Sequence, residues 1–434
     1  MKKLLVLLGS VIVAVLAISP KLLGLVIRDE ATETRLIELT GQPGLSLDMT
    51  SGWFSSQGQL TIRDPIIAGN LYRGVVLVAD LDVIHGLLLV NDDGVQLGIA
   101  RADIVPVISG LAANDPIQQL LAEDMQTAFT VLAGLDGSLR LHMDAGALQF
   151  ADADARLYLD DLQADLRIAA NGNAEVSGRS SQVTVRDTLN EMVLRDVDIT
   201  LHSEELSATP LPGGLGIRAS QLQINQPQRL TMNGISIDYV ARPEADTRTI
   251  TLQQSVQIEE IISELPVESL TLTSEITGID EDIVAGYIAF MREAQNRMQS
   301  MSDAQLQAYI ARNSEQFVLE LVRSPLQQDS QLILQAYGGE HRAELQIDWP
   351  GMAGLPTLND VDVRQVVSVI GADLDITANE EALSRSPVAA TVRAYVTQGV
   401  LPQENGNILL NASLKDSVLV VNGQEIMLAP FLNF

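Results

Sequence analysis

Cysteine is absent from this sequence of 434 residues. Its absence excludes disulfide bonds, cysteine-bound metals, thiol catalysis and the lipid modification of an amino-terminal cysteine. Aromatic residues are also scarce, at 4% of the chain, although 46% of its residues are hydrophobic. Any hydrophobic core is therefore built mainly from Leu, Ile, Val and Ala.

Basic residues are few. The chain has 27 Lys and Arg against 56 Asp and Glu, which gives a formal net charge of -29. Such a chain repels nucleic acid and anionic lipid headgroups over most of its surface, so we predict no nucleic-acid partner. The mean hydropathy of +0.17 is nevertheless high. It indicates either a large core or an apolar surface that meets a partner or a lipid.

Familiar catalytic motifs are missing as well. The sequence has no G-x-S-x-G, no Walker phosphate loop and no G-x-G-x-x-G. Its histidines form no H-E-x-x-H pair and lie in or beside strand-like runs, which favours structural or exposed roles. They are His85, His142, His202 and His341. We predict a non-catalytic protein with no cofactor and no metal.

The densest acidic cluster lies within residues 152–165. A calcium loop places its ligands at alternate positions around a central glycine, with a distal glutamate. Leu157 stands where that glycine would be required. We therefore interpret the cluster as the solvated face of a strand; its members are Asp152, Asp154, Asp160, Asp161 and Asp165.

Residues 4–27 form an almost unbroken apolar run that follows Lys2 and Lys3 and is interrupted at Pro20 and Lys21. About 20 apolar residues are needed to cross a bilayer as a helix. The run is long enough if Lys21 extends its ammonium group to the outer interface. The positive flank at Lys2 and Lys3 predicts a single-pass anchor with a cytoplasmic amino terminus and an exported body.

A cleaved signal peptide is the alternative for this segment. Val15 and Ala17 would then be the small residues before the cut. Cleavage there would leave the apolar residues 22–27 exposed to water at the start of the mature chain, which is unfavourable. We therefore favour a retained anchor over residues 1–28, followed by a polar neck over residues 29–44.

Alternating apolar and polar residues predict strands beyond the neck. The alternation in residues 45–49 and 60–62 predicts two strands joined by a turn at residues 52–56. Similar alternation continues at residues 76–83 and 95–99. These segments are typical of half-buried strands in a sheet.

A helix is expected from Asp115 to Gly134. Asp115 supplies an N-cap and Pro116 occupies the first helical position. Apolar residues, among them Ala128 and Leu132, then recur at helical spacing. We expect this helix to pack on one face of a sheet.

A short phrase then repeats along the chain: an apolar residue, a spacer, a small polar residue or glycine, and apolar-x-apolar. Four copies start 35, 38 and 35 residues apart, and two looser copies occur at residues 78–83 and 358–363. The phrase shifts the apolar alternation by one residue, which requires a bulge or a tight corner. A fixed period predicts stacked copies of one β unit, although an all-β chain can also contain such phrases by chance. The four copies are residues 159–164, 194–199, 232–237 and 267–272.

Residues 280–323 interrupt the strands with a predicted helical hairpin. Ser302 and Gln305 form a capping box at the start of the second helix, which ends before Pro325. Because unbranched Met adapts to irregular partners, the apolar stripe of this hairpin is a candidate lipid groove or dimer face. The alternative is that it covers the apolar face of the sheet. The stripe contains Val284, Tyr287, Ile288, Met291, Met298 and Phe317.

The remaining residues predict a return to strands. Strands are expected at residues 331–336 and 343–348, and a helix from Asn379 to Gln398 that Pro387 restarts. The Asn-Gly pair within residues 418–428 is the strongest hairpin signal in the chain.

Three stretches together resemble a known family: the anchor with its charged neck, the turn GWFSS at residues 52–56, and the closing hairpin at residues 418–428. With a helical pair late in the chain, they resemble the YdgA/YihF-like proteins of Gram-negative envelopes, a domain-of-unknown-function family, over essentially the whole length. The resemblance implies an inner-membrane anchor, a periplasmic body, homodimers and no catalytic residues. The repeated strand phrase also resembles AsmA-type proteins, which build long sheets with an apolar groove for lipids.

We therefore predict an α+β, mostly β fold in which an N-terminal transmembrane helix precedes an extended, curved antiparallel sheet of repeated strand units covered by a few helices. The expected domains are the anchor, the neck, a β-rich periplasmic domain over residues 45–278, and a helical hairpin plus β region over residues 279–434. The predicted function is to bind or pass lipid acyl chains in envelope maintenance. The alternative is a homodimeric structural scaffold with no ligand.

Overall fold

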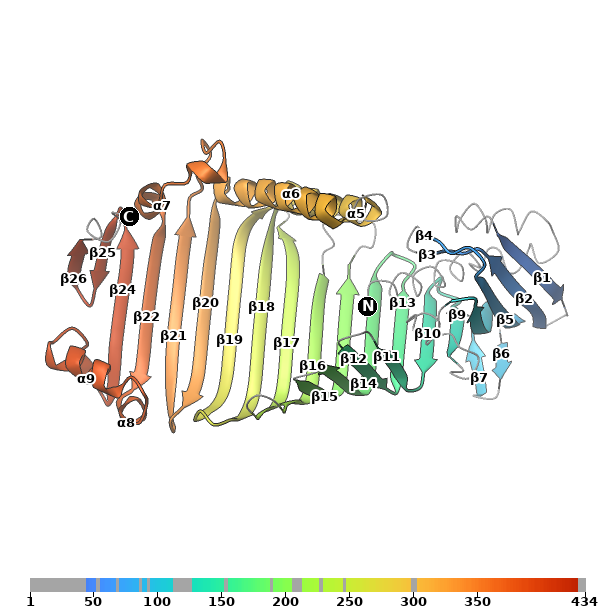
Figure 1. Cartoon of the computed structure of the whole chain (residues 1–434), viewed down its shortest axis with the longest axis horizontal. Coiled ribbons are helices and arrows are strands. Elements are labelled where there is room, and N and C mark those ends of the chain that lie inside the picture. Colours follow the sequence, from blue (N-terminus) through green and yellow to red (C-terminus); the bar gives the residue numbers. More distant parts are fainter. Residues whose placement is uncertain are drawn as a thin grey trace. The chain divides into compact units, whose positions relative to one another are not determined.

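A computed structural model of the chain (Figure 1) describes residues 44–51, 55–67, 70–85, 88–91, 94–111, 127–151, 155–187, 190–204, 213–225, 229–244, 247–297 and 303–427. The chain divides into two compact units, Met1–Leu206 and Ser207–Phe434. Antiparallel strands dominate both units, so the prediction of a mostly β fold is confirmed. The domain limits expected from the sequence stay predictions.

The first unit is built on an antiparallel sheet. Its strands are β1 Leu45–Ser51, β2 Ser55–Arg63, β5 Val76–His85, β8 Ala100–Ser109, β9 Ala128–Ala133, β10 Leu139–Ala145, β11 Leu148–Ala151, β12 Ala155–Asp160, β13 Leu162–Ile168, β14 Ala174–Asp187 and β15 Glu191–Ser203. Pairing runs in the order β1–β2–β5–β8–β9–β10–β13–β14–β15, and β12 joins β14 to β11. Two small hairpins stand apart: β3 Ile66–Ile67 with β4 Asn70–Leu71, and β6 Leu88–Asn91 with β7 Gly94–Leu97.

A hydrophobic core lies on one face of this first sheet. Every second residue of β8 is buried, from Ala100 to Ile108, and β9 alternates in the same way. Phe129 and Ile104 lie directly opposite each other on these two strands, and each exposes 1% of its surface. This alternation is the pattern expected of strands with one buried face.

The helix expected from Asp115 to Gly134 is wrong in its second half. Ala128–Ala133 is strand β9, which pairs with both β8 and β10. Residues 112–126 lie outside the described residues. Ala128 and Leu132 fit a helical spacing, but Phe129 begins an equally regular alternation of buried residues. Pairing on both sides and burial of the aromatic ring outweigh the local helical pattern.

The second unit is also built on an antiparallel sheet. Its strands are β16 Gly213–Ile224, β17 Leu230–Glu244, β18 Thr249–Ile262, β19 Val267–Asp280, β20 Leu326–Ala336, β21 Gly339–Trp349, β22 Gly371–Asn379, β23 Gln403–Glu404, β24 Asn407–Lys415, β25 Val418–Val421 and β26 Gln424–Met427. Pairing follows chain order from β16 to β22 and continues through β24, β25 and β26. The short strand β23 pairs with the start of β24.

Described helices occupy three connections of this second sheet, after β19, β21 and β22. Between β19 and β20 the predicted hairpin is confirmed as α5 Glu281–Arg297 and α6 Asp303–Arg323. The remaining helices are η1 Leu358–Asp360, α7 Val363–Val369, α8 Glu380–Ser384 and α9 Ala389–Thr397. The predicted N-cap is confirmed, because the side chain of Asn379 accepts a hydrogen bond from the Ala382 amide at 2.9 Å.

The predicted hairpins at both ends of the described chain are also confirmed. Strands β1 and β2 pair with Ser51 opposite Ser56. At the other end, Asn422 and Gly423 have φ angles of 46° and 78° and turn β25 into β26. Two consecutive positive φ angles are the requirement of the tight turn that Asn-Gly favours.

The four repeated phrases are irregular points within the strands. Asp161, Asp196 and Gly234 have φ angles of 51°, 47° and 60°, but the pairing on either side of each keeps the same register. In the fourth copy the register shifts by one residue between Val267 and Ser269, which is a β-bulge. The expected bulge is therefore confirmed in the fourth copy, and the other three copies have a residue with positive φ in place of a bulge.

The two looser copies behave differently. Residues 78–83 lie in β5, whose register with β2 is unbroken. Residues 358–363 form η1 and the start of α7, so this looser copy is not a β unit. The copy provides a helix N-cap instead, because the side chain of Asp362 accepts a hydrogen bond from the Arg364 amide at 2.9 Å.

Replacing Gly234 with alanine is expected to lower the free energy of unfolding by about 1–2 kcal/mol, the cost of a left-handed conformation for a residue with a Cβ. That Cβ would also lie 2.5 Å from a carboxylate oxygen of Glu259. Urea denaturation of the full chain measures the loss. Gly234→Asn should lose less, because asparagine tolerates positive φ. Equal losses in both variants would show that the backbone conformation is not the cause.

The predicted membrane anchor lies outside the described residues, together with Lys2, Lys3, Lys21 and all of the neck except Gly44. Among the helices that the structure does describe, none combines the length and the apolar character needed to cross a membrane.

Candidate functional site

One face of the second sheet is apolar. Residues that lie directly opposite on paired strands point to the same face, so they form rows across the sheet. The central row contains one residue from each of eight strands: Ile217, Ile237, Val256, Leu272, Leu332, Ala343, Ile376 and Leu410. Three parallel rows run from Ala219 to Ile408, from Leu215 to Ala412 and from Gly213 to Leu414. We call these four rows the apolar face.

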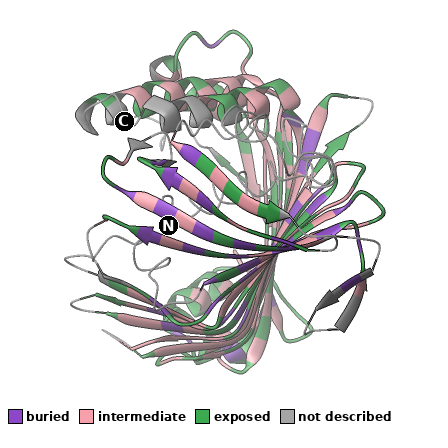
Figure 2. Ribbon diagram, turned by 90° about the vertical axis from the view of Figure 1, so that its right-hand side faces the viewer, coloured by how far each residue is buried: buried purple, intermediate pink, exposed green. Residues whose placement is uncertain are grey.

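The apolar face is not a packed core. Every residue of the central row is only half-buried. By contrast, Ile104 and Phe129 of the first unit expose 1% each. Figure 2 shows the same difference, with intermediate and exposed residues predominating along the long strands. Contiguous apolar surface that stays accessible is characteristic of a ligand or partner site.

The apolar face also lacks charge. None of its four rows contains Lys, Arg, Asp or Glu, although the chain has a net charge of -29. Burial raises the pKa of the Tyr239 phenol, which lies on this face, above its ordinary value.

Helix α6 contacts the apolar side at one end of the strands. Trp349 extends the face beyond Ile347, and its indole nitrogen donates to the carbonyl of Val322 at 2.9 Å. The guanidinium of Arg323 donates to the carbonyl of Leu355 at 2.7 and 2.9 Å. These bonds hold the end of α6 against the end of β21, and Figure 1 shows α5 and α6 lying across the strand ends.

Helix α8 packs against the opposite ends of β21 and β22. Ala382 of this helix exposes 1% of its surface, and Ala336 and Ala378 beneath it expose 2% and 8%. The helices therefore contact the ends of the strands and leave the central row accessible between them. This differs from the expected sheet covered by helices, because α5 and α6 lie across the strand ends and the other described helices are short.

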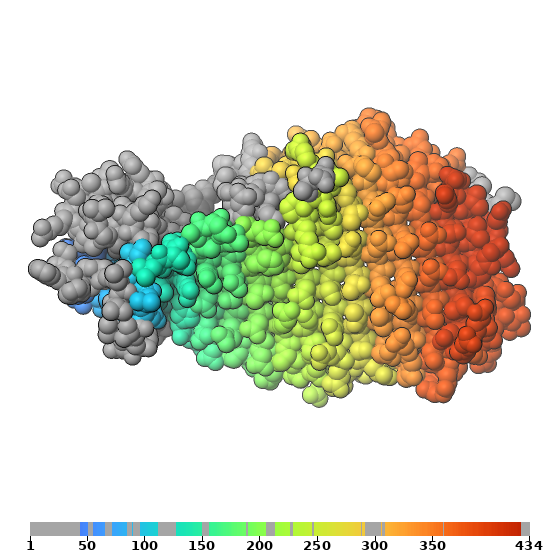
Figure 3. Space-filling model, turned by 180° about the vertical axis from the view of Figure 1, so that it is seen from behind, coloured from blue at the N-terminus to red at the C-terminus, as the bar shows by residue number. Residues whose placement is uncertain are grey.

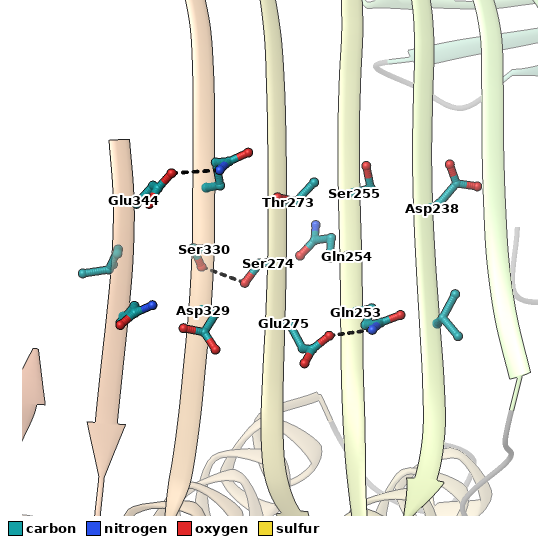
Figure 4. A pocket seen from close by; sticks show the side chains of 14 residues that line it. Asp238, Gln253, Gln254, Ser255, Thr273, Ser274, Glu275, Asp329, Ser330 and Glu344 are labelled. Atoms are coloured by element: carbon teal, nitrogen blue, oxygen red, sulfur yellow. Dashed lines mark hydrogen bonds between the residues drawn. The ribbon is translucent and has the colours of Figure 1, made fainter. Parts of the chain in front are cut away.

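The opposite face of the same sheet is polar. It contains a shallow depression of about 630 Å³ across β17 to β21. Figure 4 shows its lining, in which Gln253 bonds to Glu275 at 2.5 Å and a glutamine of β20 bonds to Glu344 at 3.1 Å. Ser274 and Ser330 also appear in this view, 2.9 Å apart, but their alternation with Thr273 and Gln331 directs their side chains to the apolar face.

Several carboxylates of this polar face are engaged by neighbouring side chains. Arg218 of β16 pairs with Asp238 of β17 at 3.1 Å, and Arg342 pairs with Glu344 on the same strand, β21, at 3.0 Å. Such exposed pairs stabilise a sheet modestly. Within the described part of the chain, no three His, Asp or Glu side chains are grouped closely enough to hold a metal. The polar face is therefore a hydrogen-bonded surface. Figure 3 shows the molecule from behind, where the yellow and orange residues of the second unit form one continuous surface.

Comparison with known proteins assigns the chain to a family. The family model described as "Bacterial protein of unknown function (DUF945)" matches residues 1–429. The chain belongs to the DUF945 family. No curated protein and no solved structure was found to match it. Membership of the DUF945 family confirms the prediction of a bacterial family of unknown function that covers essentially the whole chain. The narrower YdgA/YihF-like assignment stays a prediction.

Part of the predicted apolar stripe packs between the two helices of the hairpin in this DUF945 protein. The rings of Tyr287 on α5 and Phe317 on α6 have centroids 4.5 Å apart, and Tyr287 remains 37% exposed. Val284 and Phe317 are half-buried. Ile288 and Met291 lie in α5, but their side chains, and all of Met298, are outside the described residues. A lipid groove or dimer face at this stripe stays a prediction.

The acidic cluster of the sequence separates in the structure. Asp161 has a φ angle of 51° between β12 and β13, and Asp165 lies 2.8 Å from Nδ1 of His142 on the neighbouring strand. Asp152 and Asp154 lie outside the described residues.

Sequence reasoning named candidate groove residues only on the DUF945 helices and named none on the apolar face of the sheet, although the AsmA-type resemblance implied an apolar groove there. The signal was present, since apolar residues alternate along β17, β18 and β19. Alternation identifies a face that avoids water, but it has the same period whether that face packs against a second layer or stays accessible.

Proposed function

We propose that the apolar face of the second unit binds the acyl chains of a lipid, without catalysis. The central row carries this proposal, because it is apolar across eight strands and half-buried along its whole length. Acyl chains that lie along it would remove apolar surface from water on both partners. Each Å² removed contributes about 25 cal/mol.

The length of the central row suits this ligand. Neighbouring strands lie about 4.8 Å apart, so eight strands span about 34 Å. A bilayer core of about 30 Å contains two layers of acyl chains, which gives about 15 Å for each chain. The row therefore has room for two chains placed end to end. Because no charged residue interrupts it, a chain can also move along it.

The composition of the central row favours a lipid over a second protein chain. Protein interfaces contain roughly one hydrogen bond per 100–200 Å², and the central row offers no side-chain donor or acceptor. The described helices contact the ends of the strands, and the central row between these ends is half-buried. A membrane anchor at residues 1–28 in a periplasmic protein would place this face beside its ligand, and the apolar run after Lys2 and Lys3 supports that location.

Photo-crosslinking of the full chain in its native membrane tests the proposal. A benzophenone amino acid at Leu332 should yield lipid adducts that mass spectrometry identifies. The matched control is Gln331, the adjacent residue on the polar face. Adding Leu272→Asp beside Leu332 should lower the lipid yield about tenfold or more, because a charge on the row loses its hydration under an acyl chain. Thr273→Asp, on the other face, should leave the yield unchanged.

Two outcomes would overturn the proposal. Equal lipid yields at Leu332 and Gln331 would show that contact with the membrane is unspecific. Adducts at Leu332 with a second copy of the chain, in place of lipid, would favour the homodimeric scaffold instead.

A further inference from the structure

The apolar face contains a compact polar cluster on its central strands. Ser274 of β19 and Ser330 of β20 lie opposite each other with their hydroxyl oxygens 2.9 Å apart. The amide nitrogen of Gln328 lies 3.0 Å from the Ser330 hydroxyl and 3.5 Å from that of Ser274. Gln254 of β18, the exposed cross-strand partner of Ser274, completes the set. We call these four residues the polar cluster.

The polar cluster adjoins the central row in the middle of the sheet. Leu272 and Leu332 of that row lie two residues from Ser274 and Ser330 on the same strands and the same face. Two strands of the row lie beyond β18 on one side, and three lie beyond β20 on the other. A ligand group held at the cluster would thus have apolar surface on both sides of it.

The hydrogen bonds within the polar cluster leave donors free for a ligand. Each serine hydroxyl has one proton, and the Ser274–Ser330 contact uses only one of the two. The Gln328 amide acts toward these serines as a donor. One hydroxyl proton and the side-chain amide of Gln254 therefore remain to bond an acceptor. Polar groups covered by an apolar ligand are costly unless such an acceptor is supplied.

The acceptor that fits is uncharged. The apolar face has no Lys or Arg, so a phosphate or a carboxylate would lose its hydration there without a counter-charge. A carbonyl oxygen accepts hydrogen bonds and has no net charge. We infer that the polar cluster binds the ester or amide carbonyl that links the acyl chains of a lipid. This inference rests on the proposed function and names the part of the lipid that is recognised.

Two lipid probes that differ only at the linkage test this inference. The full chain, with the benzophenone amino acid at Leu332, is placed in vesicles of dialkyl ether phosphatidylcholine, which has no ester carbonyl. Labelled dihexadecanoyl glycerol, with ester linkages, and labelled dihexadecyl glycerol, with ether linkages, are then compared. The ester probe should crosslink about threefold to tenfold more, the range expected of one net hydrogen bond.

The variant with Ser274→Ala and Ser330→Ala should lose this ester preference while keeping the ether yield. Thr271→Ala and Thr273→Ala, on the same strand but the opposite face, are the control and should keep the preference. Equal crosslinking of both probes to the protein without the serine substitutions would overturn the inference. Acyl-chain binding would then still stand. Persistence of the preference in the serine variant would also overturn it. Failure of both probes to crosslink would refute the proposed function itself.

Discussion

Replacing Phe129 with alanine is expected to lower the free energy of unfolding of the first unit by about 3–5 kcal/mol, the usual cost of removing a large buried side chain. Phe129 exposes 1% of its surface and lies between its cross-strand neighbours Ile104 and Met143, which expose 1% and 4%. Truncation leaves a cavity that the two paired strands cannot close. Urea denaturation followed by circular dichroism measures the loss.

Leu132→Ala provides the matched comparison on the same strand. Leu132 is half-buried and points away from the core that contains Phe129. Less apolar surface is removed from water there, so we expect less than half the loss of Phe129→Ala. The two variants also test the strand itself. A helix from Asp115 to Gly134 would bury Leu132, and a larger loss at Leu132 than at Phe129 would contradict strand β9.

Replacing Gly351 with alanine should destabilise the second unit by about 2–5 kcal/mol, as the sum of a left-handed conformation and overpacking. Gly351 has a φ angle of 83°, and a Cβ there would lie 2.4 Å from the carbonyl oxygen of Arg323. The neighbouring Met352 amide donates to the Val322 carbonyl at 3.0 Å. The substitution therefore separates the end of α6 from the end of β21.

Gly354→Ala is the control for this effect. A Cβ at Gly354 meets no heavy atom within 4 Å, so the free energy of unfolding should stay within about 0.5 kcal/mol of the unmodified chain. Hydrogen exchange in the last turn of α6 should accelerate in the Gly351 variant alone. Equal stability of the two variants would show that α6 does not depend on this contact.

Local patterns in the sequence predicted much of this architecture. Asn422-Gly423 produced the closing hairpin, Asn379 capped α8, and the repeated phrases gave residues with positive φ at Asp196 and Gly234. Each of these features depends on residues close in sequence. Few residue types adopt a positive φ angle, and few cap the amides at the start of a helix. The residue type alone therefore indicates such turns and caps.

Features that depend on distant residues were harder to predict. Ala128 and Leu132 have helical spacing, and only pairing with β8 and β10 makes their segment a strand. The stripe with Tyr287 and Phe317 led us to predict a binding surface on the helices, although these two rings contact each other within the hairpin. Whether the apolar side of β17 to β22 is packed or accessible depends on how much of it the helices reach, and no single segment encodes that area.

The central row has a consequence for how such a protein could be lengthened. Each strand contributes one side chain to the row, so the number of strands sets the length of the row. One added hairpin would extend the row by about 10 Å while its width, and the fit of any chain lying on it, stays the same. The number of strands would thus set the length of ligand that the row can contact, and the identity of the side chains would set which ligand binds. These two properties can change separately.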